Sequence, residues 1–407
     1  MASKNRLRSI FSWSSITRKK PLTPRIFPTT GFETIDESYR IEEERMSIYK
    51  PEIFYPVRIG EVFQDRYQVV TKLGFGSSST IWLCHDLLDR RYAALKVHVN
   101  TIKNNRELQV FKHLKEVGSR RLSKVNIRQL KDSFKIQGPH GIHDVFVQPP
   151  LGVCLRDFQD KVPNNVFNTI FVQAALNQVL PALNFLHIDA NVIHTDFHTG
   201  NLLIGIKDES KLIQVEDAEI KSPPPRKEIG DRTIYVSRAM IGNTGPLFLC
   251  DFGEARIGRE QSGTAMPTSY RAPEVILGMK WGYPVDMWSV ALVAWDLLES
   301  KNLFNFRHVH DQDLNDACHL ADMIALLGPP PLEFLKRSED YLKFWDADGN
   351  WRGIVPIPQE RTIESLEKTL EGSEREDFLV FLRALLQWVP EERLTAKQAM
   401  SHPWLDS

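Results

Sequence analysis

The order of hydrophobic and polar residues divides the chain into two parts. From about residue 55, alternating runs such as RYQVVTKL (66–73) and RYAALKVHV (91–99) are typical of strands with one buried face. After about residue 151, apolar residues recur at helical spacing, as in FVQAALNQVLPALNFLH (171–187). We therefore expect an α+β fold with two lobes: a small antiparallel β-rich lobe at 51–150 and a larger, mainly helical lobe at 151–405.

Two segments depart from this pattern. Seven Lys/Arg residues and no acidic residue precede Glu33, which predicts a disordered basic tail over about 1–50, with a mitochondrial or nuclear address as alternatives. Consecutive prolines in KSPPPRKEIGDR (221–232) predict an exposed loop, because proline continues neither a helix nor a central strand. This loop belongs to a short insert at about 205–246 of the helical part.

Composition narrows the class of protein. The formal net charge of −1 indicates no global affinity for nucleic acid or membranes, and the longest apolar stretch, WSVALVAWDLL, is too short to cross a bilayer. The four cysteines form no C-x-x-C pair, so reduced thiols in a reducing compartment are expected. We expect a monomer in the cytoplasm, the nucleus or both.

A glycine-containing turn and a lysine suggest a phosphate site in the β-rich part. In KLGFGSSSTIWL (72–83), Gly74 and Gly76 would let backbone N–H groups approach a polyphosphate, although Ser79 replaces the usual third glycine and a plain hairpin turn stays open. Lys96 is a lone cation in an apolar strand, so it needs an anionic partner. Glu107, in the helical run NNRELQVFKHL, is the candidate carboxylate.

Polar residues in two further motifs suggest phosphoryl transfer. In VIHTDFHTGNLLI (192–204), Asp196 and Asn201 match a general base for a hydroxyl group and a Mg²⁺ ligand, and Asp251 in LFLCDFGEA is a second hard oxygen ligand. A zinc site at His194 and His198 is the alternative, but H-x-D-x-H lacks the helical spacing of H-E-x-x-H.

Taken in order along the chain, these motifs resemble the eukaryotic protein kinases over about residues 60–405. The motifs are LGFGSSSTI (73–81), Lys96, Glu107, HTDFHTGN (194–201), DFG (251–253), YRAPE (270–274), Asp286 and Arg393. The resemblance implies that Asp196, Lys96, Asn201 and Asp251 are catalytic. Asn201 and Asp251 would hold Mg²⁺. It also implies that ATP lies against a set of loop, sheet and hinge residues: Leu73, Gly74, Phe75, Gly76, Ser77, Ser78, Ser79, Ile81, Ala94, Lys96, Glu107, Pro149 and Leu151.

At the hinge, the register of the resemblance places Gln148 at the gatekeeper position. Because proline has no N–H, adenine would be held by the Pro149 carbonyl and the Leu151 N–H.

Within the kinases, the chain resembles the SR-protein kinases, which phosphorylate serines in Arg-Ser-rich proteins. The lead-in YPVRIGEVFQDRYQVVTKLGFG, the HTD triplet, Arg271 and the HPWL ending support this likeness, although the insert is shorter than in the larger members. Asp311, Asp313 and Asp316 fall where that family has an acidic docking groove, while two of its acidic positions appear as Ala317 and Cys318. A solvated loop is an alternative interpretation of this stretch.

Two departures bear on activity. His198 replaces a phosphate-contacting lysine, which leaves open an ATP-binding scaffold without turnover. H-x-D-x-H also resembles the small-molecule phosphotransferases of the aminoglycoside and choline kinase type.

Thr195 replaces an arginine that pairs with a phosphorylated activation loop in many kinases, so we predict that the kinase is active without such phosphorylation.

Overall fold

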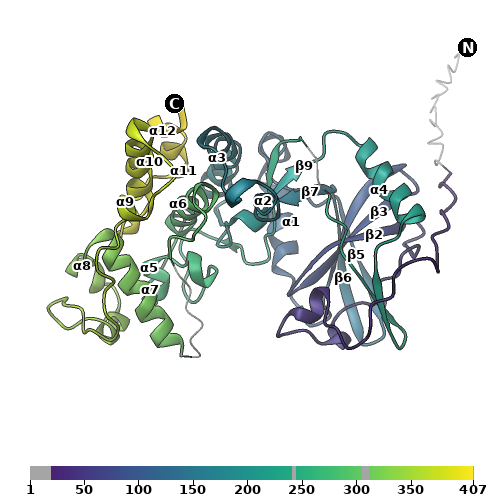
Figure 1. The fold of residues 1–407 in the computed structure, drawn as a ribbon, viewed down its shortest axis with the longest axis horizontal. Coiled ribbons are helices and arrows are strands. Elements are labelled where there is room, and N and C mark those ends of the chain that lie inside the picture. The colour runs from purple at the N-terminus through teal and green to yellow at the C-terminus, as the bar shows by residue number, and fades with distance from the viewer. Residues whose placement is uncertain (1–19, 241–243, 305–310, 407) are drawn as a thin grey trace, which may run out of the picture.

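The computed structural model describes residues 20–240, 244–304 and 311–406, in two lobes that lie side by side along the long axis (Figure 1). The smaller lobe is built on a six-stranded antiparallel sheet in the order β1-β2-β3-β4-β6-β5. Its strands are β1 Val62–Phe63, β2 Tyr67–Gly76, β3 Ser79–Asp86, β4 Arg91–His98, β5 Asp132–Gly138 and β6 Gly141–Gln148. The expected α+β fold with two lobes is confirmed.

Helix α1 (Arg106–Leu122) joins the sheet to the larger lobe. Its apolar residues Val110, Phe111 and Leu114 are buried in the same core cluster as Phe146 of β6 and the helices of the larger lobe. Because α1 packs against both lobes, residues in its first turn are positioned at the junction between them.

The larger lobe is mainly helical and closes around one hydrophobic core. Its helices are α2 Leu155–Gln159, α3 Thr169–Asn184, α5 Pro273–Ile276, α6 Pro284–Leu298, α7 Gln312–Leu327, α8 Leu332–Leu335, α9 Ile363–Leu366, α10 Gly372–Leu385, α11 Ala396–Ala399 and α12 Pro403–Asp406. Its short strands are β7 Leu151–Cys154, β8 Val192–Ile193, β9 Leu202–Gly205, β12 Leu247–Leu249 and β13 Arg256–Ile257.

Two helices of this lobe are apolar on most of their surface. Helix α6 is almost entirely buried, which explains its continuous run of apolar residues. The segment Thr169–Asp189, which contains α3, passes a length and hydropathy test for a membrane span, yet 61% of its most apolar window is buried inside the protein. We therefore describe α3 and α6 as core helices of this lobe.

The structure corrects the expectation of disorder for residues 20–50, while residues 1–19 lie outside the described residues. Phe27 and Ile41 are buried, and the 3-10 helix η1 (Glu42–Arg45) brings two buried glutamates against the sheet. Glu43 forms an ion pair with Lys72 of β2, whose side chain is 1% exposed. The segment is therefore part of the folded lobe.

The insert is also folded, in contrast to the predicted exposed loop. It contains α4 (Ser210–Lys221) and an antiparallel hairpin of β10 (Arg226–Ile229) and β11 (Arg232–Tyr235), beside the sheet in Figure 1. Arg226 is buried, and its guanidinium lies 3.8 Å from the ring centroid of Phe32. The insert and the segment 20–50 thus pack on each other.

Candidate active site

Lys96 connects the sheet, α1 and the larger lobe. Its Nζ, on β4, donates to Glu107 Oε2 at 2.8 Å and to Asp251 Oδ1 at 3.1 Å. Burial acts to lower the pKa of Lys96, but the two carboxylates outweigh it and hold that pKa above its ordinary value. The same pairing acts on Asp251, where Lys96 outweighs the effect of burial and lowers the pKa to about 2. The three predicted residues therefore lie together as a charged cluster.

Asp286, at the start of α6, fixes the backbone of the loop that follows β8. Its carboxylate is fully buried and accepts the N–H groups of His194 and Thr195, each at 2.8 Å, and it contacts His187 Nε2 at 2.8 Å. Thr195 has a φ of 65°, a conformation that a β-branched residue rarely adopts. The two hydrogen bonds to one carboxylate stabilise this backbone and so fix where Asp196 points.

Asp196 and Asn201 face each other across this loop. Asn201 Nδ2 donates to the Asp196 carbonyl and to Asp196 Oδ2, both at 2.9 Å. Because the amide nitrogen points to Asp196, Asn201 Oδ1 points elsewhere and has no hydrogen-bond partner among the described residues. Asp251 Oδ2 likewise accepts no hydrogen bond from the described part of the chain. These two hard oxygen atoms fit a Mg²⁺ ion.

The ring of His198 is held next to Asp196. Its Nδ1 lies 3.0 Å from both the Gly200 N–H and the Arg156 guanidinium, which can only donate. Nδ1 is therefore the acceptor, while Nε2 lies 3.4 Å from Asp196 Oδ1 and 3.3 Å from Asn201 Nδ2. Arg156 of α2 thus brings a positive charge close to the position where the lysine is missing. No feature of the sequence pattern pointed to Arg156.

His194 does not point toward His198, which argues against the zinc alternative. Its Nε2 lies 3.1 Å from the Cys250 carbonyl, and its ring packs edge-on against Phe252 with centroids 5.2 Å apart. Phe252 contacts Phe111 of α1, which in turn contacts Phe146. This column of aromatic rings joins the loop of Asp196 to α1 and the sheet.

The predicted glycine loop is the hairpin between β2 and β3. Ser79 pairs with Gly76 across the turn, and Gly74 pairs with Ile81, which in turn pairs with Lys96 of β4. Among the remaining predicted ATP-contacting residues, Leu73 and Ser78 are half-buried, Phe75 and Ser77 are exposed and Ala94 is fully buried. The loop therefore lies directly beside the strand that holds Lys96.

At the hinge, the Pro149 carbonyl is already engaged, contrary to the expectation that it is free for adenine. The guanidinium of Arg128 donates to it through Nε at 3.1 Å and Nη2 at 2.9 Å. Leu151 begins β7 and pairs with Gly205 of β9. Arg128 is a second residue that sequence reasoning missed, because nothing in its local pattern distinguishes a buried arginine from an exposed one.

The segment from Asp251 to Glu274 is held by contacts that need no phosphate. Thr195 Oγ1 donates to the Glu254 carbonyl at 2.8 Å, and β13 pairs with β8. At its end, Glu274 forms a bidentate pair with Arg393 at 2.6 and 2.7 Å. The segment is thus tied to the loop of Asp196 at one end and to the helical core at the other.

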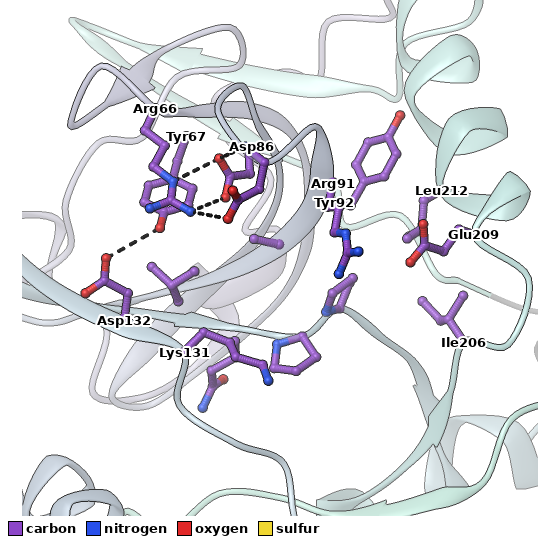
Figure 2. Close-up of a pocket in the computed structure, with 16 residues that line it drawn as sticks. Arg66, Tyr67, Asp86, Arg91, Tyr92, Lys131, Asp132, Ile206, Glu209 and Leu212 are labelled. Carbon is purple, nitrogen blue, oxygen red and sulfur yellow. Dashed lines mark hydrogen bonds and ion pairs between the residues drawn. The ribbon is translucent and has the colours of Figure 1, made fainter. Parts of the chain in front are cut away.

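A separate hollow of about 540 Å³ lies between the sheet and the insert (Figure 2). Pro149 and Pro150 of the hinge line it, together with charged residues such as Arg91 and Glu209. Lys96, Asp196 and Asp251 do not line this hollow. It is therefore distinct from the cluster around Lys96.

The sequence of this chain is similar to those of known protein kinases over nearly its whole length. A model of the protein kinase domain matches residues 67–223 and 232–405. A serine/threonine protein kinase of Aspergillus fumigatus is 41% identical, over 96% of this chain and 98% of its own. The serine/threonine-protein kinase SRPK of Physarum polycephalum is 31% identical, over 89% and 91% of the two chains. SRSF protein kinase 3 of Mus musculus is 24% identical, over 97% and 95%.

The chain therefore belongs to the protein kinase family. Its activity is that of a serine/threonine protein kinase, and the protein kinase domain implies the use of ATP. The small-molecule phosphotransferase alternative is accordingly wrong.

Proposed function

We propose that this kinase, with Mg²⁺, transfers the γ-phosphoryl group of ATP to serines in Arg-Ser-rich protein segments. Asp196 orients the substrate hydroxyl and accepts its proton. Lys96, held by Glu107, positions the α- and β-phosphates. Asn201 Oδ1 and Asp251 Oδ2 would hold the ion, which neutralises charge on the phosphates when bound.

The observation that supports an arginine-rich substrate is a hollow of about 380 Å³ beside the loop of Asp196. It is lined by Thr199 of that loop, by Tyr270 of the activation segment and by three acidic residues: Asp160, Asp296 and Glu299. Arg156 is the single basic residue in this lining, so the hollow has a net negative charge. A guanidinium group is well recognised by such carboxylates.

Asp296 is the carboxylate best placed to receive a cation. The Tyr270 hydroxyl donates to Oδ2, and Asn302 Nδ2 donates to Oδ1 at 3.2 Å, so each oxygen keeps a lone pair. Burial raises the pKa of Asp296 to about 6, although the hydrogen bond from Tyr270 opposes this shift. Asp296 is half-buried and has no ion-pair partner among the described residues, so a cationic side chain would give it the counter-charge that it lacks.

The acidic residues near 311–316 give weaker support. They lie at the N-terminus of α7, so the alternative of a solvated loop is wrong. Asp311 caps the helix through the Leu314 N–H, and Asp316 lies 3.8 Å from Arg271. Asp313 is exposed, whereas Ala317 and Cys318 are buried inside the helix packing. Of the three aspartates, Asp313 is the one free to meet a substrate.

The test measures transfer from radiolabelled ATP to an Arg-Ser peptide and to a matched peptide with glutamine in place of arginine. We expect Asp296→Asn to raise KM for the Arg-Ser peptide about tenfold or more, and to leave KM for the glutamine peptide unchanged. Tyr270→Phe is the matched control, because it removes the hydrogen bond and keeps the carboxylate.

Equal changes with both peptides would contradict the arginine site. Absence of transfer by the wild-type protein to any protein substrate would instead support the alternative of an ATP-binding scaffold.

A further inference from the structure

Arg128 is a buried cation without a carboxylate partner. It is 8% exposed, and its two hydrogen bonds from the side chain go to the neutral carbonyl of Pro149. No ion pair joins it to a described aspartate or glutamate, and burial lowers its pKa. Because a buried charge is costly unless it is paired, the position of Arg128 calls for an explanation.

The guanidinium lies at the hinge, where adenine is expected to bind. The backbone N–H of Arg128 donates to the Leu249 carbonyl at 3.0 Å, so Arg128 is adjacent to the strand that leads into Cys250 and Asp251. Its side chain then reaches the hinge at Pro149, directly after Gln148, which pairs with Ala94 of β4. Arg128 therefore spans the inner wall between the hinge and the Asp251 strand.

The hydrogen-bonding groups at the hinge favour a purine that carries an acceptor at its 6-position. A carbonyl oxygen offers two lone pairs, and two N–H groups of Arg128 converge on that of Pro149. Pro149 and Pro150 supply no N–H of their own. The 6-amino group of adenine is a donor, so it would meet a carbonyl that is already occupied and the N–H donors of Arg128. A 6-oxo group on the purine is an acceptor, so it could accept a hydrogen bond from those donors.

The Arg128 guanidinium also has N–H groups that donate to no described residue. Of the five N–H groups of a guanidinium, two are used at Pro149. Nη1 has no hydrogen bond to the described residues, and it is not among their fully buried unpaired atoms. It can therefore donate to a ligand in the cleft.

We propose that Arg128 is a specificity-determining residue that recognises an acceptor at the 6-position of the purine, so that GTP and ITP serve as phosphate donors alongside ATP. Adenine is still accepted, because its ring nitrogens N1 and N7 are acceptors next to the amino group. The transfer is unchanged: the bond from the γ-phosphorus to the bridging oxygen breaks, the substrate hydroxyl oxygen bonds to phosphorus, and the nucleoside diphosphate leaves.

This inference rests on nucleotide-dependent transfer and not on the Arg-Ser substrate. The test compares kcat/KM for ATP, GTP and ITP in the wild-type protein and in Arg128→Leu. Dissociation constants of the three nucleotides, from displacement of a fluorescent nucleotide, give a readout that needs no protein substrate. ITP lacks the 2-amino group of GTP, so it separates recognition of the 6-oxygen from any steric exclusion of the amino group.

We expect the wild-type protein to use ITP within about tenfold of ATP, and Arg128→Leu to raise the preference for ATP over ITP at least tenfold through KM. The surface variant Arg337→Leu should not change that preference. A smaller change in Arg128→Leu would overturn the proposal. If that variant does not fold, Arg128→Gln replaces it. If neither folds, a wild-type preference for ATP over ITP above about a hundredfold overturns the proposal, and a smaller one supports it.

Discussion

Replacing Glu274 by glutamine should destabilise the fold strongly, because it leaves a buried guanidinium without its counter-charge. The side chains of Glu274 and Arg393 are 1% and 0% exposed, and two hydrogen bonds of 2.6 and 2.7 Å join them. Arg393 also donates to the carbonyls of Pro284 and Gln387 and lies 5.0 Å from the Trp288 ring centroid. These contacts hold Arg393 in place, so it has no route to water when the carboxylate is lost.

The magnitude follows from this burial. Removing one partner of a buried ion pair costs about 3–5 kcal/mol, whereas an exposed pair contributes about 0–1 kcal/mol. Against a total stability of about 5–15 kcal/mol, the first loss is severe. The double variant Glu274→Gln with Arg393→Met removes both charges, so it should recover part of the loss.

The assay is urea unfolding followed by circular dichroism, with Glu391→Gln as the matched control. Glu391 pairs with Arg337 at 2.9 Å, but both side chains are exposed. We expect Glu274→Gln to lower the free energy of unfolding several-fold more than Glu391→Gln. Equal effects of the two single variants, or a double variant less stable than Glu274→Gln, would refute the reasoning.

Three further predictions concern catalysis and regulation. Asp196→Asn should lower turnover about 10²–10⁴-fold with nearly unchanged nucleotide affinity, measured by initial rates and by nucleotide titration. Because the Asp296 carboxylate is neutral below its pKa of about 6, KM for an Arg-Ser peptide should rise as pH falls through 6, with no such change for a neutral peptide. Protein expressed in bacteria and treated with phosphatase should keep its full turnover; activity that appears only after modification of Thr264 or a neighbour would contradict the inference from Thr195.

The two-lobed fold could be predicted because its signals are local. Alternation of apolar residues marks β2, β3 and β4, and the buried run of α6 marks a core helix. The residues around Lys96 could be proposed for a similar reason, since each lies in a short motif at a strand end or a loop. The distances between these residues could not be predicted from the sequence, however, because the contact from Lys96 to Asp251 joins residues 155 positions apart.

Arg128 and Arg156 escaped prediction because hydrogen bonding, not hydrophobic periodicity, decides their positions. Arg128 is buried by its bonds to a proline carbonyl, and Arg156 is placed by the ring of His198. In the sequence, each looks like an ordinary surface cation. Their partners could be known only after the hinge and the loop of Asp196 had been placed in space.

The folded state of residues 20–50 was missed for a related reason, and it changes how the glycine loop is supported. Lys72 lies two residues before Gly74, and its ammonium group is neutralised by Glu43 of the N-terminal segment while it also donates to the Tyr235 carbonyl of the insert. The same ammonium lies 5.2 Å from the ring centroid of Phe75 at the loop. The buried Lys72 therefore depends on both the segment 20–50 and the insert, and its counter-charge, Glu43, comes from outside the matched kinase domain.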